Sequence, residues 1–282
     1  MYPVISKTTI APGISRLEVE APLIAKKRKP GNFVIVMPVE KGERIPLTIV
    51  ESDPKNGTIT LIVQAIGKTT HIINKMEAGD HFIDVVGPLG EPTPIKNVGT
   101  VVCVGGGVGT AVIYPMAKAL KDAGNRVIGI IGARNRKMII LKDEMADCSD
   151  EIHITTDDGT YGLKGFVTDA LARVIDENKM IQSVYTTGPL PMMKAVAELT
   201  RKFELHTMAS LNPIMMDGTG MCGACRVSVG GELKFTCVDG PEFDAHKVNF
   251  DELIQRNKTY FNQEKKSLDA YNEKCKTRGA YV

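Results

Sequence analysis

Three of the six cysteines lie close together in a glycine-rich stretch of the chain. Cys222 and Cys225 form a C-x2-C pair, and Cys237 ends the run RVSVGGELKFTC, whose central Gly230-Gly231 predicts a hairpin turn. Such a hairpin carries the third thiol back toward the pair. Because thiolates ligate iron-sulfur clusters and zinc, this spacing predicts a metal centre.

A two-iron cluster needs a fourth ligand, and the spacing points to an unusual one. Plant-type two-iron ferredoxins use C-x4-C-x2-C with a more distant cysteine. In this chain the first position of that pattern is Asp217. We interpret Asp217, Cys222, Cys225 and Cys237 as the ligands of a [2Fe-2S] cluster. Zinc held by three cysteines and a thioredoxin-like dithiol remain alternatives, although the dithiol needs no third cysteine.

A second segment with chemical potential is VVCVGGGVGTAVIYPMAKAL, which reads as a strand, a glycine-rich turn and a helix. This arrangement directs backbone N–H groups at a diphosphate. Gly105 and Gly107 fit the first two glycines of G-x-G-x-x-G, whereas Thr110 stands at the third. The segment predicts a dinucleotide site, although similar turns also occur where nothing binds.

The strand that follows ends in GIIGARNRK, with no acidic residue to bind a ribose hydroxyl. Arg134 and Arg136 stand there instead. An arginine in this place binds a 2'-phosphate, lies over the adenine or faces solvent, so the choice between NAD and NADP stays open. Gly188 and Pro189 follow a later strand and form either part of a ligand crevice or only a turn.

The elements that position these residues fall into an antiparallel part and a parallel part. Residues 1–95 contain short β-type runs broken by Gly and Pro, which predict a small antiparallel barrel. These runs are residues 15–22, 32–39, 44–51, 57–67 and 81–90. Residues 96–211 alternate apolar strands with helical stretches, which is typical of a parallel sheet with crossover helices. Strands are expected at 100–105, 126–132, 151–156, 183–188 and 205–210, and helices at 110–123, 138–147, 166–177 and 192–203.

The last part of the chain is expected to depend on a metal rather than on a hydrophobic core. Residues 212–248 are glycine-rich and lack periodicity, so they are interpreted as an iron-sulfur segment. Residues 249–282 form a polar, lysine-rich helical tail with apolar residues too sparse for a core helix. The predicted fold class is therefore α/β plus β, with a barrel, a parallel-sheet domain and a small C-terminal segment.

Composition excludes several classes of function. The 282 residues include 35 Lys and Arg against 33 Asp and Glu, so no large positive field is available for nucleic acid. No apolar stretch reaches the roughly 20 residues of a membrane span, and the start of the chain lacks a signal-peptide pattern. We expect a cytoplasmic protein without a nucleic-acid or membrane partner.

The order of these motifs resembles the ferredoxin-NADP reductase superfamily across nearly the whole chain, up to about Phe250. R-I-P-L-T, G-K-T-T and G-P-L-G precede G-G-G-V-G-T, G-P-L-P-M-M and the cysteine loop. Within the superfamily the chain is most similar to electron-transfer subunits with a C-terminal two-iron cluster. Asp217 favours the small subunits of NADH-dependent reduced ferredoxin:NADP oxidoreductases, also described as sulfide dehydrogenase subunits. The related dihydroorotate dehydrogenase subunits have cysteine there.

This resemblance implies bound FAD, NAD(P)H and a [2Fe-2S] cluster, together with roles for individual residues. The FAD contacts would be Arg44, Pro46, Leu47, Thr48, Val63, Gln64, Gly67, Thr69 and Thr70. The nicotinamide nucleotide would contact Gly105, Gly107, Gly109, Thr110, Ala133, Arg134, Gly188, Pro189 and Met192. One departure concerns the superfamily pattern R-x-Y-[ST], because Ile45 occupies the arginine position and Arg44 precedes it.

These cofactors predict electron transfer rather than acid-base catalysis. Nicotinamides deliver hydride, iron-sulfur clusters accept single electrons, and a flavin exchanges both. We expect electrons to pass to or from a larger subunit that carries flavin and iron-sulfur groups, and to ferredoxin through it. The alternatives are the electron-transfer subunit of dihydroorotate dehydrogenase and, from another class, a non-catalytic zinc-bearing nucleotide-binding protein.

Overall fold

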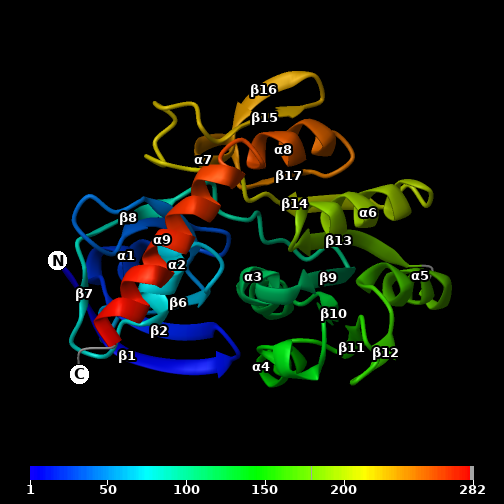
Figure 1. Cartoon of the computed structure of the whole chain (residues 1–282). Coiled ribbons are helices and arrows are strands. Elements are labelled where there is room, and N and C mark those ends of the chain that lie inside the picture. Colours follow the sequence, from blue (N-terminus) through cyan, green and yellow to red (C-terminus); the bar gives the residue numbers. More distant parts are fainter. Residues whose placement is uncertain (179, 280–282) are drawn as a thin grey trace.

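The computed structural model describes residues 1–178 and 180–279, and its first third holds two antiparallel sheets (Figure 1). The larger has the order β5-β6-β2-β1-β7 and the smaller β4-β3-β8. The strands are β1 (Tyr2–Ala11), β2 (Ile14–Glu20), β3 (Phe33–Met37), β4 (Ile45–Thr48), β5 (Glu51–Asp53), β6 (Thr58–Gln64), β7 (His81–Phe82) and β8 (Asp84–Leu89). Two short helices, α1 (Pro22–Lys27) and α2 (Lys68–Asn74), accompany them.

Alternation of apolar and polar side chains explains these sheets. In β2, Leu17 and Val19 are fully buried, while residues between them are partly exposed. They pair in register with Leu61 and Ile59 of β6, which are also fully buried. Side chains alternate faces along a strand, so such pairs build one continuous core between the sheets. The predicted antiparallel region is confirmed, and β1 is an additional strand.

A seven-stranded sheet forms the centre of the molecule, with the order β12-β11-β10-β9-β13-β14-β17. Its strands are β9 (Thr100–Gly106), β10 (Arg126–Ala133), β11 (Glu151–Thr156), β12 (Leu163–Lys164), β13 (Ile181–Thr187), β14 (His206–Ser210) and β17 (Glu242–Asp244). All neighbouring pairs are parallel except β14 with β17. The five predicted strands of the parallel sheet are confirmed.

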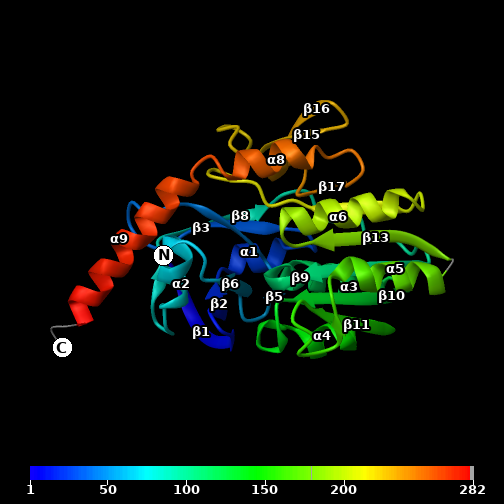
Figure 2. The same ribbon diagram turned by 45° about the vertical axis from the view of Figure 1, so that its right-hand side comes forward.

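Helices cover both faces of this sheet because its strands are apolar on both faces (Figure 2). Val101 and Cys103 of β9 pack against α3 and α4, whereas Val102 and Val104 pack against α5. The helices are α3 (Thr110–Asp122), α4 (Lys142–Asp147), α5 (Val167–Glu177) and α6 (Leu190–Arg201). Two 3-10 turns, η1 (Gly107–Gly109) and η2 (Arg136–Met138), lie at carboxyl ends of strands. Burial on both faces fixes where each strand ends, and therefore where the loops carrying functional residues meet.

The C-terminal part lies against both halves. Its elements are β15 (Arg226–Val229), β16 (Glu232–Phe235), α7 (Thr236–Asp239), α8 (Phe250–Asn257) and α9 (Phe261–Gly279). The predicted hairpin is confirmed, since β15 pairs with β16 and Gly230 and Gly231 have φ of 60° and 84°. Figure 1 shows α9 crossing the N-terminal sheets, where it packs on α2.

One expectation about the tail is wrong. The tail was expected to contain no core helix, yet α8 buries Phe250 and Leu253 among Val227, Phe243 and neighbouring residues. Two apolar side chains three positions apart lie on the same helix face, and this is enough to seal a small core. The helix α9 does match the expectation, because it is polar and mostly exposed.

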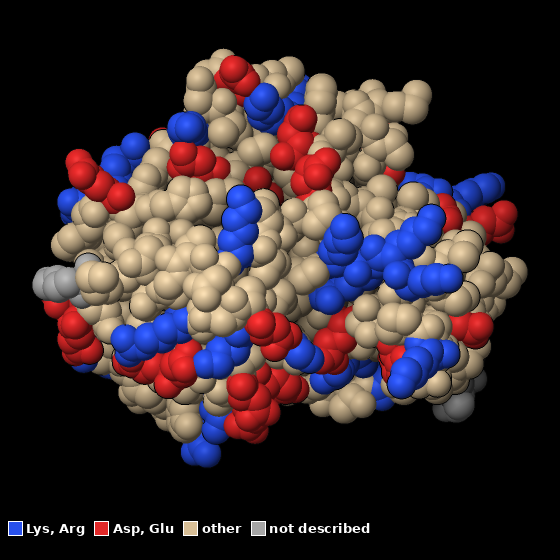
Figure 3. Space-filling model, turned by 180° about the vertical axis from the view of Figure 1, so that it is seen from behind, with Lys and Arg blue, Asp and Glu red and all other residues tan. Residues whose placement is uncertain are grey.

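Among the described residues, we find no helix that combines the length and the apolar character of a membrane span. Positive and negative side chains are both present on the face shown in Figure 3, where Lys and Arg gather in one area and alternate with Asp and Glu elsewhere. This mixture agrees with the nearly balanced charge of the sequence.

Candidate functional site

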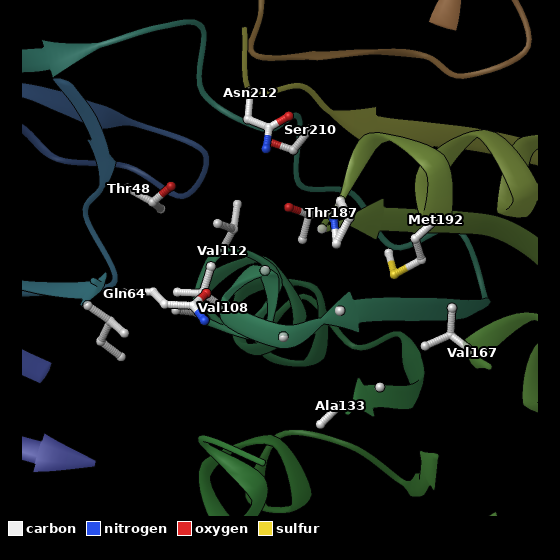
Figure 4. Close-up of a pocket in the computed structure, with 18 of the residues that line it drawn as sticks. Thr48, Gln64, Val108, Val112, Ala133, Val167, Thr187, Met192, Ser210 and Asn212 are labelled. Carbon is white, nitrogen blue, oxygen red and sulfur yellow. The ribbon is translucent and has the colours of Figure 1, made fainter. Parts of the chain in front are cut away.

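A cavity of about 850 Å³ lies between the N-terminal sheets and the carboxyl ends of the parallel strands. Figure 4 shows Thr48 and Gln64 entering it from the N-terminal side, and Ala133 and Met192 from the other. In open parallel sheets, ligands bind beyond the carboxyl ends of the strands. The volume falls within the range of roughly 300–1,000 Å³ that small-molecule and cofactor sites occupy.

Most of the predicted nucleotide and flavin contacts come together in the lining of this cavity, although they lie far apart in the sequence. The lining includes Pro46, Leu47, Thr48, Val63, Gln64, Thr70, Gly107, Gly109, Ala133, Arg134, Gly188, Pro189 and Met192. The remaining predicted flavin and nucleotide contacts are not part of the lining; they are Arg44, Gly67, Thr69, Gly105 and Thr110.

Two of these outer residues have other partners. Arg44 forms an ion pair with Asp84, with Nη2 and Oδ2 at 2.5 Å. The hydroxyl of Thr69 is buried and donates a hydrogen bond to the carboxylate of Glu43. Both side chains support the β4 and α2 walls of the cavity, and their contact with FAD stays a prediction.

The start of α2 is formed by a local hydrogen-bond motif. The backbone N–H groups of Ile66 and Gly67 each donate to the Thr70 hydroxyl oxygen at 2.9 Å, and this hydroxyl donates to the Gly67 carbonyl. A threonine at the third helical position thus satisfies backbone groups that the helix leaves without partners. The motif fixes Thr70 and Ile66, which both line the cavity.

The glycines of the dinucleotide loop have different structural roles. A Cβ on Gly105 would lie 2.9 Å from the Thr110 Cα, so this glycine lets α3 approach β9 closely. A Cβ on Gly109 would lie 2.5 Å from the Thr187 carbonyl oxygen. Gly107 has a φ of +56° and faces open space. Gly105 and Gly109 are therefore needed for packing, whereas Gly107 leaves room for a ligand beside the backbone.

Gly106, which the motif comparison did not single out, also lines the cavity. A Cβ there would lie 2.2 Å from the Met192 sulfur. Met192 lies in the first turn of α6, just after Pro189, so Gly106 lets this turn sit close to the end of β9, which pairs with β13. The Thr110 hydroxyl is buried without a partner just below this loop. The predicted strand, turn and helix are confirmed as β9, η1 and α3.

One acidic residue of the lining, Asp157, was not predicted from the sequence. Asp157 follows β11 and lines the cavity together with Ala133, which ends β10, and Arg134, which follows it. The sequence motif places an acidic residue at the end of β10, the strand after the glycine loop, but β11 lies directly beside β10. The order of strands in the sheet, which cannot be read from the sequence, brings the ends of β10 and β11 together. Arg136 is turned elsewhere, over the Tyr161 ring at 5.4 Å.

The four predicted cluster ligands are only partly brought together. Cys225 and Cys237 are buried with their sulfurs 3.2 Å apart, whereas Cys222 is exposed. The Asp217 carboxylate accepts hydrogen bonds from the backbone N–H groups of Thr219 and Cys222, both at 2.9 Å. In residues 1–178 and 180–279, no three His, Cys, Asp or Glu side chains are gathered closely enough to hold a metal ion.

The chemistry of this donor set nevertheless fits a cluster. Burial, followed by the neighbouring Cys225 thiol, raises the pKa of Cys237 to about 12. Backbone N–H groups of Thr219 and Cys222 hold the pKa of the Asp217 carboxyl below its ordinary value. Metal binding converts thiols to thiolates and couples their deprotonation to folding of the site. A buried thiol pair with an ionised carboxylate on the same loop can therefore close around a metal group.

A buried carboxyl group lies where the three parts of the chain meet. Glu242 begins β17; its Oε1 accepts a hydrogen bond from the Thr93 hydroxyl at 2.6 Å, and its Oε2 is buried with no partner. Burial raises the pKa of Glu242 to about 7. Cys103 and Tyr185 lie close enough to be affected by its charge. The preceding Pro241 lines the cavity.

Other lining residues could not have been singled out in the sequence. They include Phe33, Ser210, Asn212 and Met215. Phe33 reads as an ordinary strand residue, and Met215 as one methionine among 13. They line the cavity only because distant segments meet in the fold, so no local sequence signal marks them.

Comparisons with known proteins agree with this geometry. Residues 103–198 match the family model of the oxidoreductase NAD-binding domain. Residues 212–249 match the model of the iron-sulfur cluster binding domain of dihydroorotate dehydrogenase B. These two models cover the glycine loop and the cysteine segment, which confirms an NAD-binding domain and an iron-sulfur cluster binding domain. The individual ligands stay a prediction.

Whole-chain similarity is also high. A dihydroorotate dehydrogenase B (NAD(+)) electron transfer subunit homolog of Thermotoga maritima is 46% identical over 95% of this chain and 94% of its own. The corresponding electron transfer subunit of Geobacillus thermodenitrificans is 34% identical over 87% and 96%. A chain in the solved structure of an NADH-dependent reduced ferredoxin-NADP oxidoreductase has a TM-score of 0.91 and 45% identity, with 96% and 98% coverage.

A more distant structure, phthalate dioxygenase reductase, shares the fold at a TM-score of 0.62 and 18% identity. The superfamily resemblance is therefore confirmed, and the chain is an oxidoreductase of the ferredoxin-NADP reductase type. It belongs to the family of dihydroorotate dehydrogenase B electron transfer subunits and their homologues.

Proposed function

We propose that this chain transfers electrons between NAD(P)H, FAD and a [2Fe-2S] cluster, to or from a larger subunit that carries flavin and iron-sulfur groups. The observation that carries the proposal is the cavity, which has the glycine loop on one side, the barrel residues on the other and the buried cysteine pair behind it. When bound, the nicotinamide and the flavin supply hydride exchange, and the flavin and the cluster supply single-electron exchange.

Each part of the chain has a separate role in this proposal. Residues 1–95 form a barrel for FAD, 96–211 bind the nicotinamide nucleotide, 212–248 hold the cluster, and 249–282 form the helical tail. Pro46, Leu47 and Thr48 would lie against the flavin ring, with Val63 and Gln64 beside it and Thr70 near the diphosphate.

The glycine loop would bind the nucleotide diphosphate through backbone N–H groups at Gly107 and Gly109. Gly188, Pro189 and Met192 would position the nicotinamide, and they line the cavity next to Gly106. Asp157 would accept hydrogen bonds from the adenosine ribose, and Arg134 would lie over the adenine. This arrangement favours NADH over NADPH, because a carboxylate repels a 2'-phosphate.

Asp217, Cys222, Cys225 and Cys237 would hold the cluster. Such a centre needs reduced cysteines, so a cytoplasmic location is part of the proposal. The partner is proposed as a larger subunit because relatives are described as electron transfer subunits. Transfer to ferredoxin through that partner belongs to the same proposal, and dihydroorotate dehydrogenase is the second candidate for the partner's activity.

Cofactor analysis of protein purified without oxygen tests the proposal. We expect one FAD and two irons per chain and no stoichiometric zinc. Yellow, iron-free protein would overturn the cluster, and colourless zinc protein would overturn both redox groups. Copurification with the partner then separates the two candidates, because only one of them predicts dihydroorotate oxidation by the complex.

A further inference from the structure

The cavity and the buried cysteine pair share a wall. Phe33 and Met215 line the cavity, and both pack in one small apolar cluster with Cys225 and Cys237. Phe33 and Met215 are each 4% exposed, and the two cysteines 2% and 3%. The space between the cavity and the thiols is therefore filled by side chains of these two residues and contains little room for water.

The strand register explains why Phe33 occupies this place. In the β4-β3-β8 sheet, Phe33 lies opposite Thr48 on one side and Leu89 on the other. Thr48 lines the cavity, while Leu89 packs against the cluster of Phe33 and the cysteines. The Asn32 side chain donates hydrogen bonds to the Leu89 and Gly90 carbonyls at 3.1 and 2.9 Å, which fixes the strand beside Phe33.

The cysteine loop rests on the same strands. A Cβ on Gly218 would lie 2.5 Å from Leu89 Cδ1 and 3.0 Å from Ile35 Cγ1. Gly218 follows Asp217 directly, so the loop with the predicted ligands touches the barrel through a residue without a side chain. The loop therefore lies directly against β3 and β8, and no side chain fits between them at Gly218.

From this packing we infer that Phe33 and Met215 are positioning residues for electron transfer, because they form the medium through which electrons pass between the cavity and the cysteine pair. The inference rests on the proposed function. A bound flavin would give up the two electrons of each hydride one at a time to a bound cluster, and the single proton of that hydride would be released to water. Tunnelling rates fall steeply where a packed contact is replaced by a gap, so the wall sets this rate.

The backbone offers the electron a second route, which bypasses the Phe33 and Met215 side chains. The chain runs from Cys237 through α7 to Pro241, which also lines the cavity. Substitutions at Phe33 and Met215 leave this backbone unchanged. Their effect on the rate therefore separates the two routes.

The test uses the complete, cofactor-loaded protein with Phe33→Leu and Met215→Ala. Phe82→Leu and Met193→Ala serve as matched controls, because both residues are fully buried in other clusters. Rapid mixing with the reducing nicotinamide nucleotide gives separate rates for flavin and cluster reduction. Redox titration with electron paramagnetic resonance gives the cluster potential and spectrum.

We expect both wall variants to slow cluster reduction severalfold more than they slow flavin reduction, with unchanged potential and spectrum of the cluster. The controls should match the unmodified protein, and Phe33→Tyr should restore the rate because it keeps the ring. If Phe33→Leu does not fold, Met215→Leu, which conserves volume, gives a smaller slowing in the same step.

Unchanged cluster reduction in the wall variants would assign transfer to the Pro241 route and overturn the inference. Equal slowing in the controls would also overturn it, since the effect would then be general loss of packing. A protein without flavin or iron would instead remove the proposed function on which the inference rests.

Discussion

The nucleotide loop and the cysteine loop reach their geometry in different ways. The nucleotide loop joins two elements buried on both sides, and its glycines are fixed by backbone contacts such as Gly109 against the Thr187 carbonyl. The cysteine loop has a small core, and Met216 and Met221 on it are 56% and 88% exposed. Of its predicted ligands, Cys225 and Cys237 have their sulfurs 3.2 Å apart, while Asp217 meets Cys222 through a hydrogen bond from the Cys222 backbone N–H rather than through the Cys222 sulfur. Packing of the chain completes the nucleotide loop, whereas the cysteine loop needs a bound metal group to bring its ligands together.

The largest effect should follow from removing a buried thiol. Cys237→Ala should abolish stoichiometric iron because it removes a ligand from a site that packing alone does not close. FAD should remain, since the cavity is built from other segments. Iron and flavin analysis checks this, with Cys148→Ala as control because Cys148 is buried away from the loop. Retention of two irons would mean that the cysteine loop is preformed in the same way as the nucleotide loop.

The second effect tests the packed site. Gly109→Ala places a methyl group 2.5 Å from the Thr187 carbonyl oxygen, which should destabilise the chain by about 1–3 kcal/mol and weaken nucleotide binding. Iron content should not change. Thermal unfolding and nucleotide titration measure both effects. Gly79→Ala is the control, because its Cβ would meet no atom within 4 Å, although its φ of +98° adds backbone strain. Equal loss of nucleotide affinity in both variants would contradict the packing argument.

The third prediction concerns the choice of nucleotide. Asp157→Asn should improve NADPH relative to NADH, and Arg134→Ala should then reverse much of that gain, since one charge-assisted contact is worth on the order of 1.5–3 kcal/mol. The measurement is kcat/KM for both nucleotides. Asp158→Asn is the matched control, because the Asp158 carboxylate already accepts a hydrogen bond from the Thr160 hydroxyl. An unchanged ratio in Asp157→Asn would show that this end of the cavity does not bind the ribose.

The fourth prediction sharpens the role of Asp217. A carboxylate donates less electron density to iron than a thiolate, so Asp217→Cys should keep the cluster and lower its potential. A shift of about 60 mV corresponds to a tenfold change for a one-electron couple. Redox titration with electron paramagnetic resonance decides it. Identical potential and spectrum would mean that Asp217 only caps the loop through its bonds to Thr219 and Cys222.

The fifth prediction concerns Glu242, which lies between the two regions. Its pKa is raised by burial from 4.5 in the unfolded chain to about 7. Between these values the folded chain keeps a proton that the unfolded chain loses, so the free energy of unfolding falls as pH rises, by about 3 kcal/mol in all. Glu242→Gln should remove this dependence in denaturant titrations from pH 4 to 8. The exposed Glu40→Gln should not, and a similar slope in both would assign the dependence to another group.

The sequence predicted the parallel sheet well because its strands are buried on both faces and read as continuous apolar runs. It also predicted the hairpin, since Gly230 and Gly231 adopt the positive φ that its turn requires. The strand β1 was missed because several of its residues are exposed, so its pattern is weak. Apolar content alone could not show that Phe250 and Leu253 seal a core, because that depends on what faces them.

Most of the predicted flavin and nucleotide contacts line one cavity, and they could be singled out because glycine turns and strand ends carry local signals. Asp157, Phe33, Met215 and Glu242 were not found, because each acquires its place only when separate segments pack together. Such residues share no motif. Strand order and register are the information that the sequence does not display.

The antiparallel pairing of β17 with β14 has a consequence for how the chain can be divided. Glu242 to Asp244 lie beyond the last predicted ligand, yet they complete the sheet of the nucleotide-binding part. A fragment ending at residue 211 would leave the β14 edge open to pairing with other chains and would invite aggregation. The iron-sulfur segment is therefore not a detachable module, and exchange of such segments between relatives must carry β17 with it.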